Sequence, residues 1–272
     1  MDAVVSLSHM VIRPQPGTRV YFISDVHLGF GSRQQDAERE ALLLQLLRRI
    51  SIDAAHVFIV GDLFDAWFDY RTAVPRHHVR TLAQLAAMRE AGVPITYLMG
   101  NHDFGHYTYF RDDLAMEPLG GDVEATIGST RFYIAHGDGK AHGDRGYLLL
   151  KTVLRHPLAQ RMYRWLHPDI GIRLASGTSE KSRSHTDKKD YGQTDGLRDF
   201  AVERLEQGYD VVIMGHRHQL CSERIGQGLY VNLGHWLGAE PTFGVFQPET
   251  AEMLVVSVSE FLDRSADTSP VR

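Results

Sequence analysis

Five short motifs of this 272-residue chain contain side chains that bind divalent metal ions, and each motif follows an apolar, strand-like run. They are SDVHLG at 24–29, GDLFDAW at 61–67, GNHDF at 100–104, AHGDG at 135–139 and GHRH at 215–218. Together they supply carboxylate, amide and imidazole groups, from Asp25, His27, Asp62, Asn101, His136, His216 and His218. Two divalent ions about 3.5–4 Å apart are a general device for hydrolysing phosphate esters and anhydrides. The motifs therefore predict a two-metal site in which one carboxylate is shared.

Each motif by itself also has an ordinary structural explanation. An Asp at a strand end, such as Asp25 or Asp62, often caps a turn or the next helix. GNHD at 100–103 is compatible with a simple Asn-containing turn, and a single histidine is more often structural than a ligand. The metal site is favoured because such explanations would have to hold independently for five motifs, all at strand ends.

Strand-like and helical segments alternate in the first half of the chain. Runs rich in β-forming residues recur at 19–24, 56–60, 95–99, 131–135, 210–214, 229–233 and 243–247. Helical patterns cover 34–50 and 74–91. This alternation predicts an α/β fold with functional loops at the carboxyl ends of the strands. The later strands lack long helices between them, which predicts a second, more antiparallel sheet.

Residues 145–194 interrupt the alternation and predict a helical cap, inserted into a single domain that spans 1–272. Segments 147–154 and 158–166 have helical patterns separated by His156-Pro157, because the residue before a proline avoids the helical conformation. A polar stretch follows, and then a helix at about 197–207. The insertion lies between the fourth and fifth motifs, so we expect it beside the metal site.

Charge is distributed unevenly along the chain. The net charge is −5, yet residues 145–190 contain ten Lys and Arg against four Asp and Glu. This balance excludes a globally basic nucleic-acid binder. Apolar side chains of the cap lie among Lys151, Arg155, Arg161 and Arg164, a combination that suits a diacyl lipid and an anionic membrane surface. The alternative is a pair of amphipathic helices packed on the core with solvated cations.

Composition is that of a soluble globular protein, with 43% hydrophobic and 23% charged residues. The single cysteine, Cys221, excludes an internal disulfide and fits a reducing compartment. No apolar run reaches the length of a spanning helix, and residues 1–17 make a poor signal peptide. We therefore expect a cytoplasmic protein.

The motifs D-x-H, GD, GNHD, HGD and GHxH resemble the calcineurin-like metallophosphoesterase superfamily over residues 21–236. The resemblance implies a four-layer α/β/β/α sandwich of two mixed sheets with the metals at the strand carboxyl ends. It implies that one ion is held by Asp25, His27, Asp62 and His218, and the other by Asp62, Asn101, His136 and His216. Asp62, Asn101 and His102 would be catalytic, with His102 donating to a phosphoryl oxygen or the leaving group and Asp103 as its possible orienter.

A narrower resemblance is to the UDP-2,3-diacylglucosamine hydrolases of lipid A synthesis, especially their Bacteroidetes-type members. It rests on GDLFDAW, on AHGDG with Asp144 and Tyr147 after it, and on the basic insertion. These enzymes cleave a lipid-linked nucleotide diphosphate to UMP and 2,3-diacylglucosamine 1-phosphate. The resemblance implies two Mn²⁺ ions (with Fe, Co or Zn as alternatives) and peripheral association with the cytoplasmic face of the inner membrane. The implied substrate contacts are Asn101, His102, Asp144, Tyr147, Ser182, Lys189 and His216.

One position departs from the narrower pattern, and two other functions stay open. Proteobacterial members carry GNRD where this chain has GNHD at 100–103, which restores the general superfamily pattern. One alternative is another soluble metallophosphoesterase, either a phosphodiesterase or a nucleotide pyrophosphatase. The other is a non-catalytic scaffold of the same fold. A scaffold would be expected to have lost ligands or His102, and this chain retains them all.

Overall fold

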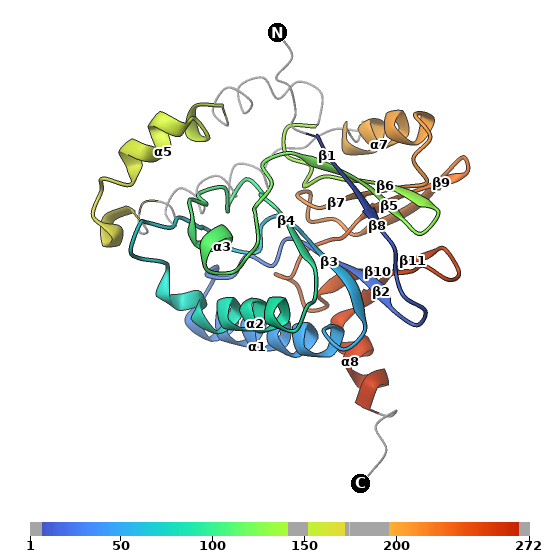
Figure 1. The fold of residues 1–272 in the computed structure, drawn as a ribbon, viewed down its shortest axis with the longest axis horizontal. Helices are drawn as coiled ribbons and strands as arrows, with labels where there is room; N and C mark the ends of the chain where they lie inside the picture. The colour runs from blue at the N-terminus through green and yellow to red at the C-terminus, as the bar shows by residue number, and fades with distance from the viewer. Residues whose placement is uncertain (1–6, 141–151, 172–173, 175–195, 267–272) are drawn as a thin grey trace.

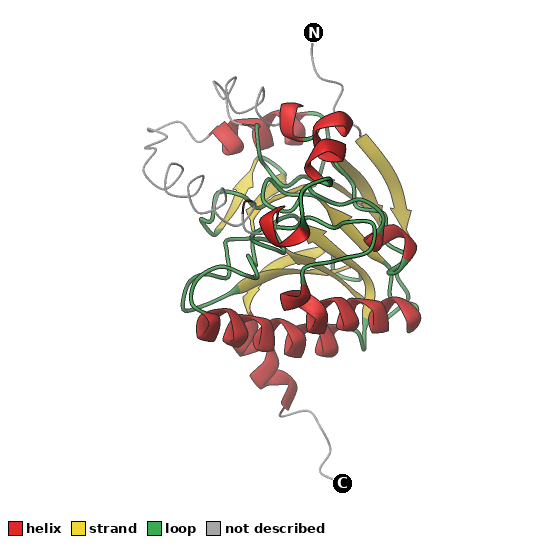
Figure 2. Ribbon diagram, turned by 90° about the vertical axis from the view of Figure 1, so that its left-hand side faces the viewer, coloured by secondary structure: helices red, strands yellow, loops and turns green. Residues whose placement is uncertain are grey.

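Two mixed β-sheets stack face to face, and helices cover both outer faces (Figures 1 and 2). The computed structural model describes residues 7–140, 152–171, 174 and 196–266. The predicted architecture of two mixed sheets flanked by helices is confirmed.

The first sheet has the strand order β11-β10-β2-β3-β4. Its strands are β2 (Arg19–Ile23), β3 (Ala54–Val60), β4 (Ile95–Leu98), β10 (Thr242–Gln247) and β11 (Glu252–Ser257). Strands β2, β3 and β4 run parallel, while β10 is antiparallel to both β2 and β11. The outer face of this sheet is covered by α1 (Arg33–Ile50), α2 (Val79–Glu90) and α8 (Val258–Ala266).

The second sheet has the order β1-β5-β6-β7-β9-β8. Its strands are β1 (Leu7–Ile12), β5 (Asp122–Ile127), β6 (Thr130–Ile134), β7 (Val211–Met214), β8 (Cys221–Ile225) and β9 (Gly228–Asn232). Helix α7 (Gly196–Glu206) packs on its outer face. Shorter elements are the 3-10 helix η1 (Arg76–His78), α3 (Tyr109–Asp112) and α5 (Pro157–Tyr163).

Strand β2 shows why its sequence is almost continuously apolar. Successive side chains of a strand point to opposite faces. Val20 and Phe22 therefore enter the layer between the two sheets, while Tyr21 and Ile23 pack towards the helices. The Phe22 ring lies 5.2 Å from that of Phe58 in the same sheet. Both faces of the strand are covered, so the side chains on both faces must be hydrophobic.

Helix α1 begins where its sequence signals a start. The Ser32 hydroxyl accepts a hydrogen bond from the Gln35 amide at 3.2 Å, and the Gln35 side chain accepts one from the Ser32 amide at 3.0 Å. This capping box satisfies two N–H groups that the first helical turn leaves unpaired. The predicted helix over 34–50 is confirmed to within one residue.

The seven predicted strands all form, but their assembly differs from the prediction in two ways. Strand β10 pairs with β2 in the first sheet, although it comes late in the chain. The second sheet is also not more antiparallel, because it has three parallel and two antiparallel pairings, against two of each in the first sheet. Strands β1, β5, β8 and β11 were not predicted. Strand pairing is a long-range choice that local patterns do not encode.

The described part of the cap contains the predicted break at His156-Pro157. Helix α5 begins at Pro157, and the His156 ring accepts a hydrogen bond from the Leu158 amide at 3.2 Å. Figure 1 shows α5 standing out from the sheets on the side where α3 lies. Residues 141–151 and 175–195 lie outside the described residues, so the domain and cap boundaries stay predictions. No described helix has the length and apolar character that crossing a membrane requires.

Two buried histidines that are not among the predicted metal ligands, His56 and His78, make stability depend on pH. Burial lowers the pKa of each to about 4. The unfolded chain takes up these protons below about pH 6.5, whereas the folded chain does so only near 4. Their contribution to stability is therefore complete above about pH 6.5 and is lost as the pH falls towards 4. We expect the free energy of unfolding to fall by about 2 kcal/mol per histidine between pH 7 and pH 5.

Urea unfolding of the metal-free protein at several pH values measures this slope without a contribution from metal release. His56→Gln removes one titrating group. The glutamine amide still offers a hydrogen-bond partner to Thr96, whose hydroxyl lies 2.8 Å from His56 Nε2 in the wild-type protein. The slope should therefore be shallower than in wild type. Equal slopes in the two proteins would contradict the prediction.

Candidate metal centre

All five motif loops meet at one edge of the sandwich. The first three follow β2, β3 and β4 of one sheet, and the other two follow β6 and β7 of the other. Both sets of strands are parallel, so their carboxyl ends point to the same edge. The structure brings together all seven predicted ligands: Asp25, His27, Asp62, Asn101, His136, His216 and His218.

The backbone adopts a rare conformation at five of these seven positions. Asp25, His27, Asp62, His216 and His218 have φ values of 51°, 51°, 52°, 68° and 59°. This left-handed region costs a non-glycine residue about 1–2 kcal/mol. Two such residues around Val26 bend the chain, so that Asp25 and His27 turn towards one point. Strain of this kind is retained where surrounding structure enforces it, most often at functional sites.

A first cluster consists of Asp25, His27 and His218. The two histidine Nε2 atoms lie 3.0 Å apart, and Asp25 Oδ1 lies 3.7 Å from His27 Nε2 and 3.4 Å from His218 Nε2. Asp25 Oδ1 is buried and accepts no hydrogen bond from any described residue. Ligands about 2.1 Å from a common ion lie roughly 3–3.5 Å from each other. The spacing and the unpaired oxygen both fit a metal ion.

A second cluster consists of Asp62, His136 and His216, with Asn101 among them. Asn101 Oδ1 lies 3.0 Å from His136 Nε2 and 2.8 Å from His216 Nδ1. The other ring nitrogen of His136, Nδ1, lies 2.9 Å from the Val60 carbonyl and donates to it. In the neutral ring this bond leaves the lone pair on Nε2, the tautomer that a metal ligand needs.

Asp62 connects the two clusters. Its Oδ2 lies 3.3 Å from His136 Nε2 and 3.8 Å from His27 Nε2, while its Oδ1 accepts a hydrogen bond from the His102 amide at 2.9 Å. Burial alone would raise the pKa of Asp62, but the neighbouring histidines, His136 first, outweigh it and hold the pKa well below its usual range. An ionised carboxylate between two clusters is suited to bridging two cations.

Asp65 was not singled out from the sequence, yet it belongs to the site. It forms a third cluster with His27 and His102. Its Oδ1 lies 3.5 Å from His27 Nδ1, and its carbonyl accepts a hydrogen bond from His102 Nδ1 at 3.1 Å. A carboxylate beside the second nitrogen of a ligand histidine orients that ring. The available signal was its place three residues after Asp62 in GDLFD.

Asp103, expected as an orienter of His102, instead holds the loop that carries it. Its carboxylate accepts hydrogen bonds from the Gly100 amide and the Leu63 amide, both at 2.8 Å, and from the Tyr97 hydroxyl at 2.5 Å. The GNHD loop is thereby tied to the GDLFD loop. The His102 ring itself is held by the Asp65 carbonyl.

The remaining predicted substrate contacts divide into two groups. Asn101, His102 and His216 lie within the site and are partly exposed. Asp144, Tyr147, Ser182 and Lys189 lie outside the described residues. The roles of both groups stay predictions.

Of the four cap cations that the sequence groups with an apolar face, the structure describes Arg155, Arg161 and Arg164. Arg155 and Arg164 turn inward and bind backbone carbonyls of the main domain, so the prediction is wrong for these two. Arg161, on the same helix as the apolar surface, is exposed. An arginine side chain can either bind carbonyl groups or face solvent. The charge pattern of a sequence does not distinguish these two outcomes.

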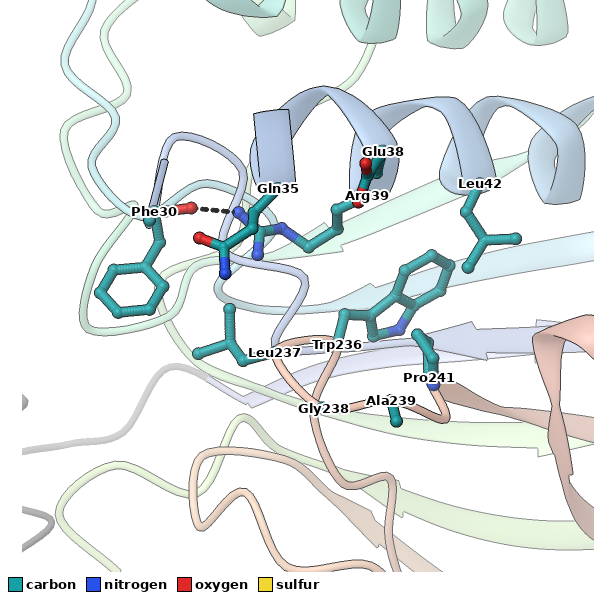
Figure 3. Close-up of a pocket in the computed structure, with 11 residues that line it drawn as sticks. Phe30, Gln35, Glu38, Arg39, Leu42, Trp236, Leu237, Gly238, Ala239 and Pro241 are labelled. Carbon is teal, nitrogen blue, oxygen red and sulfur yellow. Dashed lines mark hydrogen bonds between the residues drawn. The ribbon is translucent and has the colours of Figure 1, made fainter. Parts of the chain in front are cut away.

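A pocket of about 320 Å³ adjoins the site between α1 and the loop after β9 (Figure 3). The Arg39 guanidinium crosses one side of it and donates to the Phe30 carbonyl. The pocket walls are continuous with the first motif, because the Phe30 amide donates to the His27 carbonyl and the Trp236 amide to the Asp25 carbonyl. Apolar side chains contribute much of the lining, with Leu42, Trp236 and Leu237 among them.

The chain is similar to several known proteins. A family model described as calcineurin-like phosphoesterase matches residues 18–220. A UDP-2,3-diacylglucosamine hydrolase of Porphyromonas gingivalis is 31% identical over 238 residues, which cover 81% of this chain and 91% of that protein. One from Pectobacterium carotovorum is 27% identical, covering 84% and 91%. Among solved structures, an archaeal phosphodiesterase matches 88% of this chain and 99% of its own, with a TM-score of 0.44 and 16% identity.

Proposed function

Because the chain belongs to the calcineurin-like phosphoesterase family, we propose that it hydrolyses UDP-2,3-diacylglucosamine at the diphosphate, yielding UMP and 2,3-diacylglucosamine 1-phosphate for lipid A synthesis. The observation that carries the catalytic part is the pair of ligand clusters that meet at Asp62. The substrate assignment draws on the curated relatives, which bear this activity in their names and align with most of the chain.

We propose that Asp25, His27, Asp62 and His218 hold one ion, and that Asp62, Asn101, His136 and His216 hold the other. The buried, unpaired Oδ1 of Asp25 and the tautomer of His136 support this assignment. Carboxylate, amide and imidazole ligands suit Mn²⁺, our choice, and also Fe, Co and Zn. When bound, the two ions polarise the phosphoryl group and activate water.

His102 and Asn101 would act on the substrate directly. The His102 ring is anchored through Nδ1 to the Asp65 carbonyl, and its backbone amide is anchored to Asp62. Because Nδ1 donates to the Asp65 carbonyl, the ring would donate to a phosphoryl oxygen through Nε2 in its protonated form, as charge develops there. Because the group that departs is itself a phosphate monoester, it requires little protonation.

The cap supplies the lipid-facing part of the proposal. Eight of the fourteen exposed large apolar side chains among the described residues lie between 153 and 174. Trp165 is 85% exposed and Met162 66%, and Arg161 next to Met162 is also exposed. A concentrated apolar surface with an adjacent cation is typical of a membrane-binding site. We propose that this cap surface contacts acyl chains and the cytoplasmic face of the inner membrane.

Trp165→Ser is expected to lower binding to vesicles that contain phosphatidylglycerol by about tenfold, because a large buried apolar side chain contributes about 1.5–3 kcal/mol. Sedimentation with vesicles measures the affinity. The control is Ile52→Ser, since Ile52 is 78% exposed and follows α1 on a different face. Equal binding by wild type and Trp165→Ser, with or without a loss in the control, would exclude the cap surface as the contact.

The experiment that tests the function is hydrolysis of UDP-2,3-diacylglucosamine with added Mn²⁺, beside bis-p-nitrophenyl phosphate as a generic ester. Metal-dependent release of UMP supports the proposal. Cleavage of the generic ester and of soluble nucleotide diphosphates, without cleavage of the lipid, would replace it with a nucleotide pyrophosphatase or phosphodiesterase. No hydrolysis with any of the four metals would favour a non-catalytic scaffold.

A further inference from the structure

Two arginines of the cap hold the backbone of the loop that carries Asn101 and His102. Arg155 Nη2 donates to the Gly100 carbonyl at 2.7 Å. Arg164 Nη2 donates to the carbonyls of Gly105 and His106 at 3.4 Å and 3.3 Å. The carbonyls on both sides of the segment 101–104 are thus bound by side chains from a different part of the chain.

Both arginines make several contacts with the main domain. The Arg155 side chain is 17% exposed, and its Nη2 also lies 3.5 Å from Asp138 Oδ2. The Arg164 guanidinium lies 4.8 Å from the centre of the Phe68 ring and 4.4 Å from that of Tyr107. Its Nε donates to the Asp69 carbonyl at 3.2 Å. Charged donors give stronger hydrogen bonds than neutral ones, and a planar guanidinium can serve several carbonyls together.

The main domain holds the same loop through other atoms. Within the loop, the Asp103 carboxylate accepts from the Gly100 amide. From the main domain, the Asp62 carboxylate accepts from the His102 amide. At Gly100 the amide is therefore bound by Asp103 of the same loop and the carbonyl by the cap. The adjacent residue, Asn101, places its Oδ1 within 3.0 Å of both His136 and His216. A shift of the loop would move this oxygen relative to both histidines.

We propose that Arg155 and Arg164 are positioning residues: by docking the cap they fix the 100–106 loop, and with it Asn101 and His102, in the arrangement used for phosphoryl transfer. The inference rests on the proposed two-metal function, but it does not depend on the identity of the lipid substrate. It also gives the cap a role in the chemical step, beyond contact with acyl chains.

Arg155→Ala and Arg164→Ala should each lower kcat on bis-p-nitrophenyl phosphate by about tenfold to a hundredfold, the effect of misplacing a catalytic group by about 1 Å. The KM for this small ester should change little. Arg164→Lys should not restore kcat, because one ammonium group cannot replace the planar fork at three carbonyls. Arg224→Ala is the matched control, because Arg224 is exposed on β8, outside both the cap and the candidate site, and its kcat should equal that of wild type.

Hydrogen–deuterium exchange of the metal-loaded protein provides a readout that is separate from activity. Amides of peptide 99–108 should exchange severalfold faster in Arg155→Ala and Arg164→Ala, while those of 39–50 in α1 keep their wild-type rates and report an intact fold. If the alanine variants do not fold, the same two measurements on Arg155→Lys and Arg164→Lys decide, and a wild-type kcat with wild-type exchange would overturn the inference.

A different pattern would also overturn it. If kcat on the generic ester and exchange of 99–108 are unchanged while KM for UDP-2,3-diacylglucosamine rises, the two arginines serve only substrate binding. Failure of the proposed function is distinguishable, because a protein that cleaves the generic ester but not the lipid still allows kcat on the generic ester and the exchange of 99–108 to be measured.

Discussion

Asp62→Ala is expected to abolish hydrolysis of both bis-p-nitrophenyl phosphate and UDP-2,3-diacylglucosamine. The Asp62 carboxylate lies between the two ligand clusters, with Oδ2 within 3.8 Å of His27 Nε2 and 3.3 Å of His136 Nε2. Its removal deprives both ions of a shared anionic ligand and leaves several buried histidines without a counter-charge. We expect kcat to fall by at least about 10³-fold, which corresponds to roughly 4 kcal/mol of lost transition-state stabilisation.

Metal content separates this explanation from simple misfolding. Elemental analysis should find two ions per wild-type chain and fewer in Asp62→Ala. Asp62→Asn keeps the shape and one ligating oxygen but removes the charge, and it should also be inactive while remaining folded. The control is Asp263→Ala, because Asp263 is exposed on α8. Wild-type activity with two bound ions in either Asp62 variant would refute the bridging role.

Gly100→Ala is expected to have the second largest effect, although glycine has no side chain to take part in chemistry. A Cβ atom at position 100 would lie 2.0 Å from Asp62 Oδ1 and 2.6 Å from the Asp62 amide nitrogen. Neither atom can withdraw easily, because Asp62 is buried among the ligands and Gly100 is hydrogen-bonded through both its amide and its carbonyl. The methyl group would therefore displace the shared carboxylate or the GNHD loop.

We expect Gly100→Ala to lower kcat by about a hundredfold or more, and to lower the free energy of unfolding by about 1–3 kcal/mol, as overpacking typically does. Steady-state kinetics and urea unfolding measure the two effects. In the matched control, Gly120→Ala, an added Cβ meets no atom within 4 Å, so both quantities should be close to wild type. Full activity in Gly100→Ala would show that the loop can move without disturbing Asp62.

The local features of this fold were predictable because they depend on neighbours in the chain. Helix α1 follows from its leucine spacing and the Ser32–Gln35 capping box. Strand β2 follows from a run of apolar residues that both faces require. Four other strands escaped prediction. In β1, for example, the apolar Leu7 and Val11 lie at exposed positions, so polar and apolar residues do not alternate with burial.

The residue types alone predicted the chemistry of the candidate site, but they did not predict the contacts between its side chains. Asp25 and His27 carry their functional groups whatever the fold, so their candidacy needed only the motif. The role of Asp65 depends on a 3.5 Å approach to His27, which no spacing rule predicts. The two cap arginines were assigned to a cationic face suited to a lipid surface, with solvated cations as the alternative, because their partners, carbonyls some 55 to 95 residues away, have no sequence signature.

The sequence by itself determined the set of candidate metal ligands, their order, the strand ends that present them, and the family they imply. Only the tertiary structure decided how the sheets assemble, with β10 beside β2, and which atoms of the ligands face each other. It also decided that the cap and the 100–106 loop are joined through Arg155 and Arg164. The physical reason is the distance along the chain over which each effect acts. Helix and strand propensity and hydrophobic periodicity depend on near neighbours in the sequence. Strand pairing, side-chain burial and contacts between charged atoms depend on residues that only folding brings together.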